Sequence, residues 1–333
     1  MDLMSPICRY TFDTRELIET HPAKLHHPNK RIVYDIACPA NSVHSEQLVF
    51  SRWNAIALSL TFSKSSATDL EVREGYFKYE PFRSEDRQVE WHLNFADRNL
   101  FYAYGSALFA QDEMQVAEHP ALGSLREALL SQGILPATEE QGRPTPVLVR
   151  GVERRCVIAT DPNPEQGRPF GLYGNRFSAA DPSTIQRATV PIIPPTTTNI
   201  LAIAAPGYGS GAYTVQDIEY ILTTAFTGFS AARLESSFVC ADPIVVIHTG
   251  FWGCGAFGGD RVLMTLLQLI AAHLAEVNCL IFYAVDATGT AAVATARRIL
   301  ERNLDAIDAS IPVSELVRAI ADLKFQWGMS DGN

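Results

Sequence analysis

Apolar residues fall into a regular alternation of strand-like and helix-like segments from residue 200 onward. Short apolar runs predict strands, and longer segments with an apolar stripe predict helices. The predicted strands are 200–205, 243–249 and 280–285, and the predicted helices are 214–226, 261–277, 288–302 and 313–325. Because strands that alternate with helices usually pair in parallel, this part of the chain predicts a largely parallel α/β sheet.

The clearest single strand lies earlier, over residues 88–95. Four apolar residues alternate there with four polar ones, which is the period of a strand that buries one face. A helix is predicted over 107–118, and it should end before His119 and Pro120. Between this helix and residue 200 we expect a short strand at 155–160 and loops at 136–146, 161–169 and 191–199.

The first 88 residues carry weaker patterns and are predicted to be mainly helical. The best helical segment is 44–62, where Leu48, Trp53 and Ile56 contribute to an apolar stripe. The polar stretch 63–69 is interpreted as a linker. We therefore expect a mainly helical N-terminal accessory region at 1–88 and an α/β domain at 89–333.

Composition narrows the class of protein. Apolar residues make up 47% of the chain, which is enough for a sizeable core. The net charge of −10 disfavours a nucleic acid partner, and no apolar run is long enough for a membrane span. Six cysteines without a CxxC pair argue against a zinc site and a disulfide framework. With no signal peptide at the start of the sequence, we expect reduced thiols in an intracellular, cytoplasmic protein, a nuclear location being left open.

The stretch HTGFWGCGAFGGD, residues 248–260, holds five glycines in thirteen positions. It lies between a predicted strand and a predicted helix, and Asp260 stands where the helix would be capped. Glycines allow positive φ and let a ligand approach the backbone, so N–H groups at such a turn can bind an anion. The pattern predicts a phosphate-binding loop.

Two other interpretations of this loop remain open. Gly253–Gly258 matches the dinucleotide fingerprint GxGxxG, but the acidic residue expected about 20 residues later is missing. The nearest candidate, Asp286, lies 28 residues after Gly258, so a nicotinamide or flavin enzyme is not favoured. A glycine turn that serves only tight packing is the other alternative. The aromatic residues Phe251, Trp252 and Phe257 count against this alternative, because they resemble walls around a flat ligand, although aromatic residues more often simply pack.

Two segments of the chain resemble one known family. TGFWGCGAFGGD at 249–260 resembles the diphosphate loop of poly(ADP-ribose) glycohydrolases, TGNWGCGAFGGD, with Phe251 in place of asparagine. Residues 94–113, from Asn-Phe-Ala-Asp to Gln-Asp-Glu, resemble that family's catalytic segment DFAN…GGG…QEE in spacing. Two departures are Asp112 for the first glutamate and Phe101-Tyr-Ala in place of the triple glycine. The resemblance spans roughly 89–300 and implies a macrodomain, which is an α/β/α sandwich with a mixed sheet.

The resemblance also implies roles for individual residues, without a metal or a cofactor. Glu113 is the expected acid and base, and Asp112 is expected to accept hydrogen bonds from ribose hydroxyls. Asp97 and Gln111 are expected at the same ribose. The expected diphosphate ligands are Gly253, Cys254, Gly255, Ala256, Phe257, Gly258 and Gly259. Phe282 and Tyr283 are candidates for stacking on adenine.

These roles imply hydrolysis of the bond between ADP-ribose and a protein side chain. Such bonds break through an oxocarbenium-like transition state, in which a carboxylic acid protonates the leaving atom and then activates water. The expected partners are ADP-ribose and an ADP-ribosylated protein. Bulk at Phe101 and Tyr102 favours removal of single ADP-ribose units, with arginine as the first candidate linkage. The alternatives are a poly(ADP-ribose) glycohydrolase and a catalytically inactive ADP-ribose-binding module.

Overall fold

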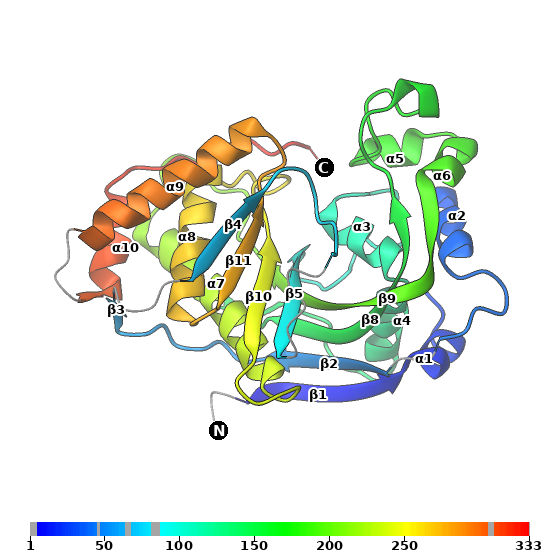
Figure 1. Cartoon of the computed structure of the whole chain (residues 1–333), viewed down its shortest axis with the longest axis horizontal. Helices are drawn as coiled ribbons and strands as arrows, with labels where there is room; N and C mark the ends of the chain where they lie inside the picture. The colour runs from blue at the N-terminus through cyan, green and yellow to red at the C-terminus, as the bar shows by residue number, and fades with distance from the viewer. Residues whose placement is uncertain (1–4, 45–46, 64–67, 81–86, 306–309, 333) are drawn as a thin grey trace.

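An eight-stranded mixed sheet forms the centre of the described chain (Figure 1). The computed structural model describes residues 5–44, 47–63, 68–80, 87–305 and 310–332. In sheet order, the strands are β1 (Pro6–Asp13), β2 (Gln47–Trp53), β8 (Val147–Ile158), β9 (Thr189–Ala204), β5 (Gln88–Ala96), β10 (Ile244–Thr249), β11 (Cys279–Tyr283) and β4 (Asp69–Arg73). Two short pairs lie outside this sheet: β12 (Ser310–Pro312) with β3 (Thr61–Ser63), and β6 (Glu139–Glu140) with β7 (Arg143–Pro144).

The two halves of the sheet differ in strand direction. β1, β2, β8 and β9 pair antiparallel, whereas β9, β5, β10, β11 and β4 pair parallel. The five parallel strands therefore end at the same edge. Open α/β sheets bind ligands outside the carboxyl ends of their strands, so this edge is where a site is expected.

Helices cover both faces of the sheet. They are α1 (Thr14–Thr20), α2 (Pro28–Ala37), α3 (Gln111–Glu118), α4 (Ala121–Ser131), α5 (Asn175–Ala179), α6 (Pro182–Ala188), α7 (Val215–Ser236), α8 (Arg261–Leu274), α9 (Ala287–Asp305) and α10 (Val313–Ala321), with a 3₁₀ turn at Pro164–Gln166. Leu201 packs with α7 and α8 on one face, and its neighbours Ile200 and Ala202 pack with α4 on the other. The expected α/β/α sandwich with a mixed sheet is confirmed.

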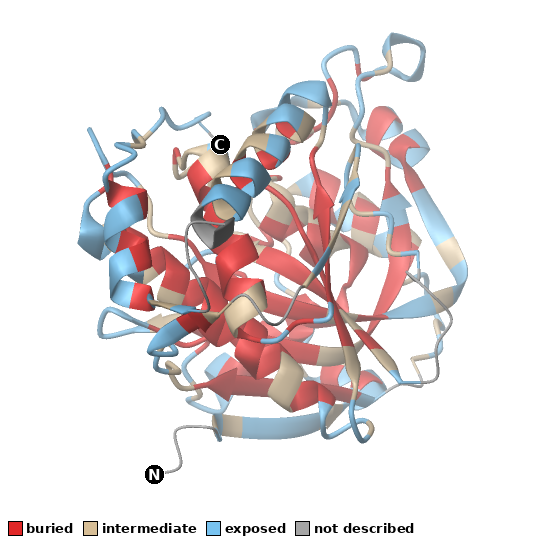
Figure 2. Cartoon of the chain, turned by 60° about the vertical axis from the view of Figure 1, so that its left-hand side comes forward, coloured by how far each residue is buried: buried red, intermediate tan, exposed pale blue. Residues whose placement is uncertain are grey.

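Burial follows this layering. The sheet is buried through its centre, and the peripheral helices bury their inner faces and expose their outer ones (Figure 2). On the polar face of β5, His92 and Asn94 are buried, whereas Gln88 and Glu90 are partly exposed. None of the helices in the described ranges combines the length and the apolar character that a membrane span requires. All six cysteines are free thiols.

The mainly helical N-terminal region is a wrong prediction. The segment 44–62 contains no described helix, because residues 47–53 form β2 between β1 and β8. Its apolar residues satisfied a helical stripe, but β2 is buried at every position except Gln47. Pairing on both sides therefore outweighed the local pattern. The division at residue 88 stays a proposal, although β1, β2 and β4 on its N-terminal side belong to the central sheet.

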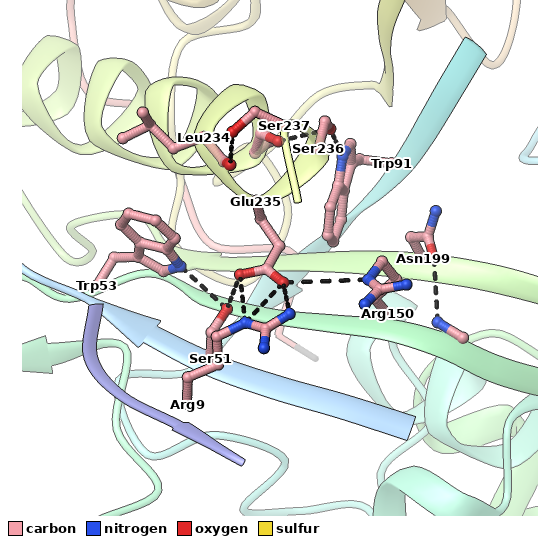
Figure 3. A network of polar contacts seen from close by, with 12 residues as sticks. Arg9, Ser51, Trp53, Trp91, Arg150, Asn199, Leu234, Glu235, Ser236 and Ser237 are labelled. Carbon is pink, nitrogen blue, oxygen red and sulfur yellow. Dashed lines mark hydrogen bonds and ion pairs between the residues drawn. The ribbon is translucent and has the colours of Figure 1, made fainter. Parts of the chain in front are cut away.

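A buried carboxylate ties the N-terminal strands to the rest of the molecule (Figure 3). Glu235, at the end of α7, accepts hydrogen bonds from Arg9 of β1 at 2.9 Å and from Ser51 of β2 at 3.0 Å. The Ser51 hydroxyl also accepts from the indole N–H of Trp53 at 3.0 Å. One charged group thus joins two strands and the longest helix.

Most predicted elements after residue 88 are confirmed, with three corrections. The predicted loop 136–146 contains the short strands β6 and β7. β8 begins well before the predicted strand at 155–160, and β9 includes residues 191–199, which were predicted to be a loop. The outer half of β9 pairs only with β8 in the described chain, and β5 joins β9 from Ile200 onward. Prolines are tolerated at such an open strand edge, so Pro191 and its neighbours did not prevent a strand. Residues 64–67 of the predicted linker lie outside the described residues.

Candidate functional site

A glycine loop, residues 250–260, connects β10 to α8 at the carboxyl edge of the sheet. Gly253 and Gly258 have φ of 75° and 69°, which strains any residue with a side chain. A Cβ added at Gly253 would also lie 2.6 Å from the Ala205 methyl group. Asp260 accepts a hydrogen bond from the Leu263 N–H at 2.8 Å, so it is the N-cap of α8 that the sequence predicted.

Buried side chains anchor the loop from below. The Trp252 indole donates to the Ile203 carbonyl at 3.0 Å, and the Gln268 amide donates to the Gly250 carbonyl at 3.1 Å. In the part of the chain that the structure describes, the N–H groups of Gly255, Ala256 and Phe257 donate to no protein acceptor. The loop is therefore rigid at its base and presents backbone donors at its tip, which is the chemistry of an anion site. Cys254 points elsewhere, with its thiol toward the Trp252 carbonyl at 3.6 Å.

α3 begins beside the end of β5, and Gln111 fixes it there. The Gln111 side-chain oxygen accepts from the Phe95 N–H at 2.8 Å, and its amide donates to the Leu93 carbonyl at 3.0 Å. Both ends of this side chain thus bind strand backbone. Gln111 positions the helix, and its side chain is not offered to a ribose.

Two buried carboxyl groups follow in the first turn of α3. Asp112 and Glu113 are only 6% and 4% exposed. Asp112 accepts a hydrogen bond from the Asn94 amide of β5 at 3.1 Å, and Glu113 accepts one from the Ala110 N–H at 2.9 Å. Burial, followed by the neighbouring Glu113 charge, raises the pKa of Asp112 well above the usual aspartate range, although the Asn94 bond opposes this. An acid pair that resists losing its last proton suits proton transfer near neutral pH.

Lys30 of α2 is a buried cation beside this pair that sequence reasoning missed. Its ammonium group donates to the Tyr104 carbonyl at 3.0 Å and lies 4.9 Å from the centre of the Phe109 ring. Desolvation lowers the pKa of Lys30 to about 8, while the charges of Glu113 and Asp112 raise it. The only signal in the sequence was a lysine within a predicted helical region, which did not indicate burial.

Tyr173 lies between the glycine loop and the acid pair. A Cβ added at Gly255 would lie 3.8 Å from the Tyr173 hydroxyl. Burial, and then the charges of Asp331 and Glu113, raise the pKa of Tyr173 to about 12. The tip of the loop and the start of α3 therefore face the same tyrosine at one end of the sheet.

Asp97, Phe101 and Tyr102 lie in the segment between β5 and α3. Asp97 is exposed, its carboxylate accepts from the Asn99 N–H at 2.8 Å, and its charge also raises the pKa of Asp112. Phe101 was expected to add bulk to the ligand pocket, but its ring is buried in the hydrophobic core. The Tyr102 side chain is exposed.

The predicted adenine platform is enclosed by protein. Phe282 packs edge-on against Phe251 at 5.1 Å, and the Tyr283 hydroxyl lies 3.4 Å from a His248 ring nitrogen. Both rings are buried, so neither can stack on a ligand without rearrangement. Tyr76, by contrast, is 56% exposed at the end of β4, where Gly75 bridges to Val285 after β11. Within the described ranges, no group of three or more His, Cys, Asp or Glu residues is arranged to hold a metal ion.

Comparison with known proteins bears on one part of this site. Residues 170–292 match the family described as poly(ADP-ribose) glycohydrolase (PARG), macro domain fold. This range contains the glycine loop and Tyr173 but not α3.

Solved structures of two bacterial poly(ADP-ribose) glycohydrolases are similar along most of the chain. The enzyme from Thermomonospora curvata, bound to the inhibitor ADP-HPD, is 16% identical, with a TM-score of 0.47 over 86% of this chain and 96% of that one. The enzyme from Deinococcus radiodurans, in complex with ADP-ribose, is 14% identical, with a TM-score of 0.43 over 88% and 94%.

Proposed function

We propose that this protein, whose residues 170–292 match the poly(ADP-ribose) glycohydrolase family with the macro domain fold, hydrolyses the glycosidic bond that links ADP-ribose to another group. One observation carries the proposal: free backbone donors and a buried acid pair lie at the same end of the sheet and face the same tyrosine. Either feature alone would be ambiguous.

The glycine loop supplies the binding site for the diphosphate. Its donors are the N–H groups of Gly255, Ala256 and Phe257, and the positive end of α8 adds to the attraction for an anion. Because Phe282 and Tyr283 are enclosed, we place the adenine beside the exposed ring of Tyr76. The diphosphate would then lie between the adenine and the ribose nearest α3.

The acid pair supplies the proton transfers. Glu113 donates its proton to the leaving atom as the bond to the anomeric carbon breaks, and the resulting carboxylate then removes a proton from the attacking water. Asp112, held by Asn94, binds the ribose hydroxyls. Lys30 acts as a positioning residue, because its charge limits how far burial raises the pKa of Asp112.

For the linkage, we propose arginine-linked mono-ADP-ribose. Asp97, Asp112 and Glu113 form an acidic set, and a guanidinium leaving group pairs well with carboxylates. The buried Phe101 leaves only Tyr102 as bulk on the loop that precedes α3, so steric exclusion of polymer is weaker than the sequence suggested. Poly(ADP-ribose) is therefore the second candidate substrate, favoured by the family match.

A release assay over defined linkages tests these alternatives. The purified protein is incubated with arginine-, serine- and glutamate-linked mono-ADP-ribose and with polymer, and free ADP-ribose is quantified. Fastest release from arginine supports the proposal, and fastest release from polymer replaces the proposed linkage. Tight binding of ADP-ribose without release from any substrate would indicate a binding module and contradict the hydrolase proposal.

A further inference from the structure

The last described residues lie across the glycine loop. We name residues 326–332 the C-terminal strap. The Gly328 N–H donates to the Gly258 carbonyl at 2.8 Å, and the Trp327 ring stacks on Tyr213 at 4.1 Å. In Figure 1 this end of the chain lies on the side toward which β10 and β11 point. Trp327 and Gly328 therefore anchor the strap at the carboxyl edge of the sheet.

Beyond this anchor, the strap brings a carboxylate to the tip of the loop. The Asp331 N–H donates to the Gly255 carbonyl at 3.4 Å. A Cβ added at Gly255 would lie 3.0 Å from a carboxylate oxygen of Asp331 and 3.8 Å from the Tyr173 hydroxyl. Asp331 thus lies beside the amides assigned to the diphosphate, on the side of the loop that faces Tyr173.

We infer that the C-terminal strap is autoinhibitory, because the Asp331 carboxylate lies beside the diphosphate subsite and repels an anion there until residues 329–332 move away. This inference rests on the proposed function, which assigns the subsite. The amides of Gly255, Ala256 and Phe257 donate to no acceptor in the described chain, so Asp331 acts on a bound diphosphate by charge repulsion and by crowding the loop. ADP-ribose therefore binds only after residues 329–332 move away.

The strap is built so that its end can move while its anchor stays. Trp327 is packed against Tyr213 and fills the space above Gly209, where an added Cβ would lie 2.1 Å from the indole. Met329, two residues later, is 95% exposed. Releasing residues 329–332 uncovers little apolar surface, so displacement needs no unfolding of α10 or the loop.

Two variants and two measurements test the inference. Asp331→Asn removes the charge, and truncation after Met329 removes the end of the strap but keeps Trp327 and Gly328. Asp322→Asn, at the exposed end of α10, is the control with the same change in net charge. Hydrogen exchange of residues 250–259 in the free protein reports whether the strap covers the loop. Calorimetry with ADP-ribose reports whether the strap weakens binding.

The truncated protein should exchange faster at residues 250–259, and both test variants should bind ADP-ribose at least about fivefold more tightly than the wild type and the control. The gain from Asp331→Asn should shrink at high salt. If truncation leaves the exchange rates at 250–259 unchanged, the strap does not cover the loop. If the wild type binds ADP-ribose and both test variants bind it with the same affinity, the strap does not inhibit binding. If truncation speeds exchange but neither the wild type nor any variant binds ADP-ribose, the strap does cover the loop and the proposed function is contradicted.

Discussion

At the scale of residues, the proposed chemistry depends on charges that are held out of water. Asp112 and Glu113 are adjacent in sequence and buried together, and Lys30 comes from a helix more than 70 positions away in the chain. Two carboxylates in one buried place disfavour double ionisation, and a nearby cation offsets part of that penalty. The sequence indicated the pair, but only the fold brings the lysine to it.

Replacing Asp112 should make folding stability less sensitive to pH. The folded chain holds this proton to a higher pH than the unfolded chain, whose aspartate has a pKa of about 3.9. Between these two pKa values the unfolded state binds fewer protons, so the stability of the wild type falls as pH rises. Asp112→Asn removes this loss and keeps an oxygen for Asn94.

Thermal unfolding from about pH 4 to about pH 8 checks this prediction. The Tm of Asp112→Asn should gain on the wild type as pH rises, by about 1.4 kcal/mol of stability for each unit of pKa shift. Glu19→Gln, a surface change on α1, should follow the wild type. A constant difference at all pH values would show that Asp112 ionises without a penalty.

Replacing Lys30 should move the pH dependence of turnover. Removing its charge in Lys30→Met raises the pKa of Asp112 further, so the high-pH limb of kcat/KM should move upward by about one pH unit. Lys30→Arg keeps a charge and should restore most of the wild-type profile. A loss of activity at every pH, without a shift of the high-pH limb, would mean that Lys30 only holds the Tyr104 carbonyl in place.

At the scale of elements, the glycine loop is specified by backbone geometry. Gly253→Ala introduces a side chain at positive φ, which costs about 1–3 kcal/mol, and places it against Ala205. We expect ADP-ribose affinity to fall by about tenfold or more, because the free amides at the loop tip move.

Gly133→Ala is a matched control for this loop variant. Gly133 also has positive φ, at 69°, but an added Cβ would meet nothing within 4 Å. It should lose stability and keep its affinity for ADP-ribose. Equal affinity losses in the two variants would indicate a general effect of strain and no specific role for the loop.

Glu235 should matter for stability and not for the chemistry. Glu235→Gln weakens its bonds to Arg9 and Ser51 in a buried place, and we expect a loss of about 1–3 kcal/mol in denaturant unfolding. Glu276→Gln breaks an exposed pair with Arg233 and should cost about 0–1 kcal/mol. Equal losses would mean that the N-terminal strands are not joined to the fold through Glu235.

Local patterns predicted most elements of the parallel half of the sheet and failed in the antiparallel half. β5, β10 and β11 have short apolar runs bounded by turns, so their positions followed from the sequence. β2 and the outer half of β9 were predicted as a helix and a loop, but both pair with neighbouring strands. Non-local pairing of this kind has no signature at short range.

At the scale of the whole molecule, the proposed site is assembled from segments that are distant in the chain. The glycine loop and the acid pair were predictable because each has a compact motif. Tyr173, Lys30 and Asp331 were missed, because each is an isolated residue whose role comes only from the edge of the sheet where it arrives. The resemblance assigned Gln111, Phe282 and Tyr283 to the ligand. In the fold these side chains contact protein groups, so the proposed site does not use them.

We predict that one carboxyl group performs the proton transfer and another part of the site performs the binding. Measuring ADP-ribose release and ADP-ribose affinity on Glu113→Gln separates the two most directly. Release should fall by about a thousandfold, while the Kd for ADP-ribose stays within about twofold of the wild type. Release at the wild-type rate by Glu113→Gln, on whichever linkage the native protein cleaves fastest, would contradict the account.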